Sequence, residues 1–495
     1  MLPDKFRHQL RHELEVWRAE GLIDDSQHEQ LSERYQFNTL DTVARNRFIM
    51  ILLGLGSILI GLGVITFVAA NWQELPRSAK VTLLLSLFIG VNITGFYLWS
   101  RHNEAQQRLG QGLLILGALI LGANMGLMGQ MFHISNPFYE LFLAWGIGVL
   151  AMAYSLRLTS LGVLSIILLM LGYWHFWWNA VVEVWSTSSS LEEFSWSSFM
   201  GQHMPLLVCL IVVPLAYWCR SRWIFGLGAI ALVFSLEGNI LMLNAQAVSA
   251  QSMAWVLALA FTLPAALLWG YDDSLWVYGN LFQQSNRGRD RLVAAISSFQ
   301  PIAHNLALFS LGIMFFSASF SEFWNNLSFP DSVARSPVFS WFPLLDILLL
   351  GALAIVEWLR LALLARQRLN QTDLTTIVVG VLLLISALLP FWHLSVAPIS
   401  ILATFIFNVM LFLLAAGLMR EGLAQGERRA FWSGMVLLTL RILVWFLLSA
   451  TGLVFKSLVF ILCGVGVIAI GLWFERYVRT LSNKPNRRSL KSPLS

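Results

Sequence analysis

Five charged side chains lie within or close to the ends of long apolar stretches of this sequence: Glu140, Glu237, Asp346, Arg441 and Lys456. An ionisable group surrounded by hydrocarbon is costly, so a charge in such a place is a candidate functional group. An unpaired one costs roughly 3 kcal/mol on insertion scales. We therefore expect Arg441 to pair with Glu237 or with Asp346.

Counting residues from the ends of the apolar stretches supports this pairing. At a rise of 1.5 Å per helical residue, Glu237, Asp346 and Arg441 fall at depths of roughly 8 to 12 Å below the same boundary. One interpretation is structural: the pair fixes which helices adjoin. The other is that a carboxylate exchanges a proton or meets a cationic group while Arg441 reorganises, as in an ion-coupled carrier.

Glu237 is the preferred acid because Gly238 and Asn239 follow it directly. Gly weakens a helix and Asn adds a polar side chain, and carriers often build their sites from interrupted spans. We therefore predict a helix break at Gly238 and Asn239.

Polar but uncharged side chains also lie within apolar stretches. We expect interhelical hydrogen bonds from each, with ligand contact as the alternative. They are Asn92, Asn124, Gln130 and Asn408.

The sequence gives no catalytic residue, metal site or cofactor. The phosphate-loop, nucleophile-elbow, zinc-protease and dinucleotide motifs are absent. His133, His175, His203 and His393 map to one rim but lack ligand spacing. We expect a protein that is not an enzyme, with a membrane-embedded transferase or hydrolase as a remaining alternative.

The stretches that hold these residues identify a membrane protein. Apolar residues make up 57% of the 495 and charged residues 12%, whereas soluble domains carry about 25% charged residues. The net charge of +5 is spread over many short loops, which gives no indication of nucleic-acid binding.

The predicted fold is all-α: a polytopic transmembrane helical bundle with about 14 spans, each about 20 residues long. The boundary between the third and fourth runs, near His133, is the least marked in the sequence. As an alternative to two spans, these two runs would form a re-entrant pair. The runs are 48–70, 80–99, 109–131, 137–156, 160–178, 204–219, 223–243, 251–270, 301–319, 341–359, 374–391, 396–419, 431–449 and 453–474.

The orientation follows from the positions of Lys and Arg. With both termini in the cytoplasm, most of the 32 basic residues fall on the cytoplasmic side, as the positive-inside rule requires. The opposite side holds Arg77, Lys80, Arg335 and Lys456. We therefore expect an integral membrane protein with both termini in the cytoplasm.

Residues 1–46 are predicted to form a small cytoplasmic helical hairpin. Leu10, Leu14 and Trp17 recur at helical spacing, Gly21 suits a helix C-cap, and Asp24 with Gln27 resembles a capping box. The hairpin would dock on the protein's own inner face or on a partner. Residues 47–475 form the bundle, and residues 476–495 form a basic, disordered cytoplasmic tail.

Small residues predict close helix packing in the third apolar run. Ala118, Gly122 and Gly126 recur at intervals of four residues. Such a stripe lets two helix backbones approach and gain contacts that lipid does not supply.

Two segments resemble a known family. They are Trp17 with Gly21-Leu22-Ile23-Asp24, Leu31 and Tyr35, and then Phe67-Val68-Ala69-Ala70-Asn71-Trp72 with Leu75-Pro76 and Lys80. Together they resemble the N-terminal hairpin and first-span turn of a family of predicted bacterial membrane proteins, domain of unknown function 2157. The resemblance covers about the first 150 residues. The resemblance implies a bacterial multi-pass membrane protein, and hence the bacterial cytoplasmic membrane, and it supplies no catalytic residues.

These observations favour a carrier or flippase-like protein for a small or lipid-linked solute. The alternative is a noncatalytic scaffold, sensor or assembly factor that binds a partner through residues 1–46. A carrier predicts a water-accessible cavity at Glu237, Asp346 or Arg441. A scaffold predicts a closed bundle with exposed apolar surface on the hairpin. The sequence gives no oligomeric state.

Overall fold

A computed structural model describes most of the chain, and every regular element in the described ranges is a helix. The described residues are 10, 13–14, 16–35, 59, 76–133, 137–185, 195–245, 249–273, 299–327, 342–367, 374–448 and 453–482. The chain divides into two compact units, Met1–Gly90 and Val91–Ser495.

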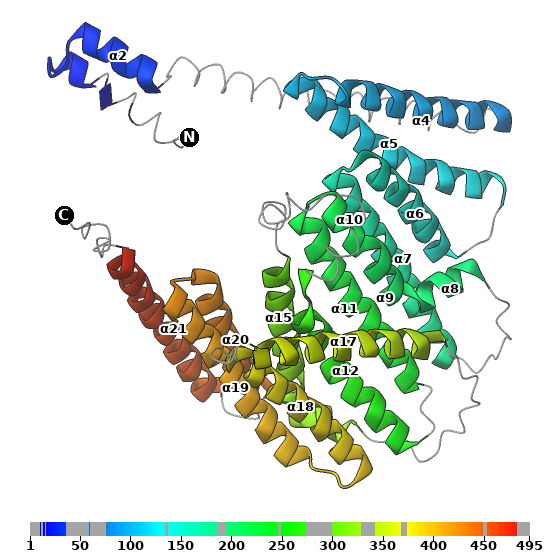
Figure 1. Cartoon of the computed structure of the whole chain (residues 1–495), viewed down its shortest axis with the longest axis vertical. Helices are drawn as coiled ribbons and strands as arrows, with labels where there is room; N and C mark the ends of the chain where they lie inside the picture. Colours follow the sequence, from blue (N-terminus) through cyan, green and yellow to red (C-terminus); the bar gives the residue numbers. More distant parts are fainter. Residues whose placement is uncertain are drawn as a thin grey trace. The chain divides into compact units, whose positions relative to one another are not determined.

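The helices follow the apolar runs of the sequence (Figure 1). They are α2 (Asp25–Tyr35), α4 (Arg77–Trp99), α5 (Glu104–Met131), α6 (Phe138–Leu156), α7 (Thr159–Trp185), α8 (Trp196–Gln202), α9 (Met204–Leu207), the π-helix η1 (Val208–Val212), α10 (Val213–Trp218), α11 (Arg222–Ala245), α12 (Ala250–Gly270), α15 (Gln300–Ala318), α16 (Ser321–Asn325), α17 (Phe342–Gln367), α18 (Leu374–Ser395), α19 (Ser400–Gln425), α20 (Arg428–Leu448) and α21 (Leu453–Ser482).

Ten of these helices are long and apolar enough to cross a membrane: α4, α5, α6, α7, α11, α12, α15, α18, α19 and α20. The bent pair of α8 with α9–α10 raises the number to 11 if it is one span. The runs on both sides of His133 each form a helix of spanning length, α5 and α6. The chain is therefore an all-helical integral membrane protein with about ten spans in its described part.

The remaining predicted spans have other outcomes. The run 48–70 lies outside the described residues, apart from residue 59. The run 341–359 forms α17, a helix of 26 residues that carries Asp346, Glu357 and Arg360 and is not among the ten. In α21 the apolar stretch Lys456–Leu472 is shorter than the others.

The described part of the N-terminal unit has helical residues on both sides of Gly21, the second set being α2. Leu14 is buried against Leu10, Ile23 and Leu31. Gly21 has a φ of +74°, which glycine adopts without strain at a helix C-terminus. The Gln27 N–H donates to the Asp24 carboxylate (2.7 Å), and the Asp24 N–H donates to the Gln27 side chain (3.1 Å). This confirms the capping box, and its hydrogen bonds lower the pKa of Asp24.

Two apolar cores hold the second unit together. One lies mainly among α6, α7, α11 and the α9–α10 region, and the other among α12, α15, α18 and α19. Helices α19, α20 and α21 follow one another as packed neighbours in the orange and red part of Figure 1.

The small-residue stripe of α5 forms a close seam with α6. Ala118 is fully buried, and its carbonyl accepts a hydrogen bond from the Trp145 indole N–H (2.7 Å). A Cβ at Gly122 would lie 2.3 Å from the Trp145 ring, so only glycine leaves room for that indole. The predicted seam is confirmed.

The predicted break at Gly238 and Asn239 is wrong, because α11 is continuous through both residues. A Cβ at Gly238 would lie 2.2 Å from the Tyr173 hydroxyl, so this glycine allows a helix–helix approach. The broken region is instead at His203, where α8 and the segment Met204–Trp218 meet at a bend of 76°.

Candidate functional site

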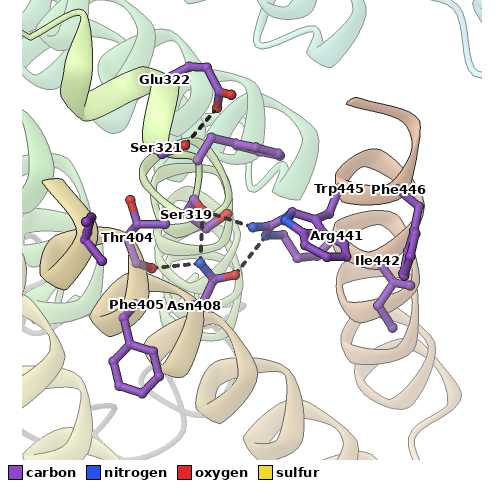
Figure 2. Close-up of a pocket in the computed structure, with 12 residues that line it drawn as sticks. Ser319, Ser321, Glu322, Thr404, Phe405, Asn408, Arg441, Ile442, Trp445 and Phe446 are labelled. Carbon is purple, nitrogen blue, oxygen red and sulfur yellow. Dashed lines mark hydrogen bonds between the residues drawn. The ribbon is translucent and has the colours of Figure 1, made fainter. Parts of the chain in front are cut away.

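A pocket of about 600 Å³ opens where α15 ends and where α19 and α20 pass beside it. The polar part of its lining comes from the turn Ser319–Glu322, from Thr404 and Asn408 on α19, and from Arg441 on α20. Figure 2 shows the Arg441 side chain reaching from its helix toward Ser319 and Asn408.

Arg441 is held by three neighbours. Its Nε donates to Oδ1 of Asn408 (3.0 Å), and its Nη2 donates to the backbone carbonyl of Ser319 (3.0 Å). Its guanidinium carbon lies 4.4 Å from the ring centre of Phe320, a cation–π distance. The two hydrogen bonds, drawn as dashed lines in Figure 2, and the Phe320 ring therefore fix the guanidinium plane.

Asn408 is oriented by its own amide nitrogen. Nδ2 donates to the Ser319 carbonyl (2.9 Å) and to the Thr404 carbonyl one turn earlier on α19 (2.7 Å). With both amide hydrogens used, Oδ1 is left facing Arg441. Ser319 thus accepts from two side chains because its carbonyl lies just past the end of α15, where helical acceptors are free.

Two buried donors in this pocket have no hydrogen-bond partner among the described residues: Nη1 of Arg441 and Oγ1 of Thr404. Buried polar atoms are nearly always paired, so such atoms beside a cavity suggest a ligand. Glu322 is exposed at the rim, where the Ser321 hydroxyl lies 3.4 Å from its carboxylate. The arrangement offers an acceptor a fixed cation whose Nη1 amino group has no hydrogen-bond partner among the described residues.

The two acids predicted to pair with Arg441 lie outside its pocket. Asp346 is fully buried, and its Oδ1 lies 2.6 Å from Nδ1 of His203. Glu237 is half-buried on α11 and makes no hydrogen bond or ion pair within the described residues. The predicted pairing of Arg441 with Glu237 or Asp346 is therefore wrong: Arg441 binds an amide and a carbonyl, and Asp346 lies against an imidazole, while Oδ2 of Asp346 has no hydrogen-bond partner among the described residues.

A buried polar network surrounds the break at His203. The Asn239 amide donates to the Gln202 carbonyl (2.5 Å), and the Tyr173 hydroxyl donates to the Ser235 carbonyl (2.9 Å). The Trp177 indole donates to the Gly238 carbonyl (3.1 Å). The polar residues predicted to break α11 thus bind neighbouring helices instead.

Glu140 and Lys456 do not join Arg441. Glu140 accepts a hydrogen bond from the Ser197 hydroxyl (2.8 Å). Lys456 donates to the carbonyl of Leu447 (3.1 Å), next to the last residue of α20, and so caps that helix. The five charges predicted as a cluster are distributed over several local sites.

Of the four polar side chains, Asn408 alone lines the pocket. Asn92 lies against α5, where a Cβ at Gly117 would be 2.5 Å from its amide. Asn124 is buried on α5, and Gln130 is exposed near the end of the same helix.

Sequence reasoning missed Glu357 and the role of Ser319. Glu357 is buried on α17 and stands inside a predicted apolar run, so a stricter search for acids in such runs would have found it. Ser319 acts through its backbone carbonyl, which no residue type indicates. Within the described residues no three His, Cys, Asp or Glu side chains are grouped to hold a metal ion.

The fold and the apolar surface define a polytopic α-helical membrane protein. Residues 15–162 match the model of a family described as "Predicted membrane protein (DUF2157)", which confirms the family resemblance for this part of the chain. No curated protein and no solved structure is significantly similar to the chain.

Proposed function

We propose that the protein is a carrier or flippase-like transporter that binds the anionic group of a small or lipid-linked solute at Arg441. The observation behind this proposal is the unpartnered Nη1 of Arg441 beside a pocket of about 600 Å³. A guanidinium presents N–H donors in a fixed fork that suits carboxylate and phosphate oxygens. Nη1 is the donor left over after Asn408 and Ser319 are bound.

The apolar part of the lining supports a solute with a hydrocarbon portion. Ile401 is 85% exposed, Phe405 64% and Trp445 50%. In a membrane protein, such exposed apolar side chains face the hydrocarbon of the bilayer. A pocket with a cation inside and apolar residues at its mouth suits an amphiphile that enters from the lipid, head group first.

The proposed setting is the bacterial cytoplasmic membrane with both termini in the cytoplasm. The distribution of Lys and Arg supports this orientation. In that orientation α15 and α20 both end at the outer side, and the Arg441 pocket would lie near the outer leaflet.

Binding of dodecyl phosphate tests the site, with dodecyltrimethylammonium as the cationic comparator. The full chain in zwitterionic lipid nanodiscs should bind the phosphate more tightly than the ammonium compound. In Arg441→Gln the affinity for the phosphate should fall by about tenfold to a hundredfold, the value of one or two charge-assisted hydrogen bonds. The matched control is Arg429→Gln, which removes an exposed arginine from the other end of the same helix. Equal affinities of Arg441→Gln and the unmodified protein would contradict the proposal.

A second candidate function is a membrane scaffold or sensor that binds a partner through the N-terminal hairpin. Leu22, in the turn of the hairpin, is 68% exposed, and Trp17 is 37% exposed. A scaffold of this kind would migrate as a larger complex from native membranes and would lose that complex in Leu22→Glu. A carrier would be unaffected by Leu22→Glu and impaired by Arg441→Gln.

A further inference from the structure

A second pocket, of about 220 Å³, lies between α11, α12, α17 and the π-helix η1. Its lining is aliphatic and aromatic except for Cys209, Tyr271 and Glu357. It shares no lining residue with the Arg441 pocket and carries an acid where the other carries a base.

Glu357 is the unusual member of this lining. It is 4% exposed, and its Oε2 is buried without a hydrogen-bond partner among the described residues. Arg360, one turn further along α17, has an ion pair with Asp272 (3.8 Å). A buried carboxyl group in an apolar wall is costly unless something supplies donors or a positive charge.

The Tyr271 hydroxyl does not supply that donor. The Tyr217 hydroxyl donates to the Asp273 carboxylate (2.5 Å) and lies 2.6 Å from the Tyr271 hydroxyl. Since the single proton of Tyr217 goes to Asp273, Tyr271 must donate its own proton to Tyr217. Glu357 is therefore an acceptor in the pocket wall that receives no hydrogen bond from the Tyr271 hydroxyl.

The backbone around the pocket is also irregular. The π-helix Val208–Val212 contributes Val208 and Cys209 to the lining, and single π turns recur at functional sites. A Cβ at Gly228 would lie 2.6 Å from a methyl group of Val212, so this glycine accommodates the wider turn.

We propose that this pocket binds a small apolar molecule that carries one ammonium group, with Glu357 as its counter-ion. The ammonium group brings the hydrogen-bond donors that the buried Oε2 of Glu357 lacks, together with a positive charge next to that oxygen. The apolar body replaces water against the aliphatic walls. The volume is below the range of about 300–1,000 Å³ typical of pockets for drug-sized ligands, so the ligand is small. This inference does not depend on the anion site at Arg441.

The test compares 2-phenylethylamine with 2-phenylethanol, which has a similar shape and no charge. Binding to the full chain in zwitterionic nanodiscs is measured by saturation-transfer NMR, with protein-free nanodiscs as the blank. We expect the amine to bind more tightly than the alcohol. In Glu357→Gln the amine should lose about tenfold or more in affinity, while the alcohol should change by less than about threefold.

Three further variants test whether the preference for the amine comes from Glu357 and from this pocket. Glu357→Asp should keep the preference for the amine, and Leu350→Phe, which fills the pocket, should weaken both probes. Glu427→Gln removes an exposed acid elsewhere and should change neither. An amine affinity that is equal in Glu357→Gln and in the unmodified protein, or a wild type that does not prefer the amine, overturns the proposal.

A second measurement holds even if Glu357→Gln does not fold. In a protein with Cys219→Ser and Cys463→Ser, Cys209 is the remaining thiol and lines the pocket. The amine should slow the alkylation of Cys209 by N-ethylmaleimide several-fold, and the alcohol should slow it less. An alkylation rate that the amine leaves unchanged also overturns the proposal.

Discussion

Several charged residues in the described part of this protein bind polar groups on neighbouring helices rather than a residue of opposite charge from the predicted cluster. Arg441 binds Asn408 and the Ser319 carbonyl, and Asp346 lies against His203. Sequence reasoning identified Arg441, Asp346 and Asn408 as polar groups at depth, because depth follows from counting residues along a helix. It did not give the partners, because counting along one helix does not say which face meets which neighbour.

The contact between His203 and Asp346 predicts a strong effect on stability. His203→Ala leaves Asp346 buried without its imidazole partner, and removal of one partner from a buried pair costs about 3–5 kcal/mol. We expect a loss of that order in the free energy of unfolding, measured by SDS titration in mixed micelles. His133→Ala, an exposed histidine, should change it by less than about 0.5 kcal/mol.

A double-mutant cycle checks that this loss comes from the pair. The effects of His203→Ala and Asp346→Leu should be non-additive by at least about 1 kcal/mol, because the double variant leaves no unpaired charge. Strictly additive effects would mean that the two side chains do not stabilise one another.

At the scale of helices, local signals were reliable where they act through backbone geometry. The Asp24–Gln27 capping box and the Gly122 seam were both readable, because a cap and a close approach each demand a particular residue type. The position of the helix break was not readable from the sequence. Gly238 accommodates Tyr173 in a continuous helix, whereas the bend lies at His203, two residues before Pro205 in the first turn of α9.

Gly122→Val tests the seam between α5 and α6. The added side chain would collide with the rigid Trp145 ring, and overpacking of this kind costs about 1–3 kcal/mol. Gly129→Val on the same helix is the matched control, since a Cβ there meets nothing within 4 Å. We expect the midpoint of thermal unfolding in detergent to fall in Gly122→Val and to stay unchanged in Gly129→Val. Equal midpoints for the two variants would show that the seam does not depend on glycine.

At the scale of the molecule, composition and run length predicted an all-helical membrane protein. The number of spans was harder to predict, because an apolar run indicates a helix but does not show whether that helix crosses the membrane. α17 illustrates this: the run 341–359 forms a helix of 26 residues that carries Asp346, Glu357 and Arg360 and is not among the ten helices of spanning character. Pockets depend on how many helices converge, and no single run of sequence carries that information.

The predicted orientation has its own test. In a chain whose three cysteines are replaced by serine, single cysteines at Arg366, Ser492 and Ser189 are treated with a membrane-impermeant maleimide on intact cells. Arg366→Cys and Ser492→Cys should react only after the membrane is opened, and Ser189→Cys should react at once. Labelling that puts the Arg366 turn and the carboxyl tail on opposite faces would contradict the predicted orientation.

The proposed function requires that Arg441 hold an anionic group that moves across the membrane. The most direct measurement is the translocation of fluorescent phosphatidylglycerol in proteoliposomes, followed by quenching of the outer leaflet with dithionite. We expect translocation that requires the protein, falls about tenfold or more in Arg441→Gln, and persists in Arg429→Gln. A correctly folded Arg441→Gln protein that translocates this lipid at the rate of the unmodified protein would contradict the proposed role of Arg441.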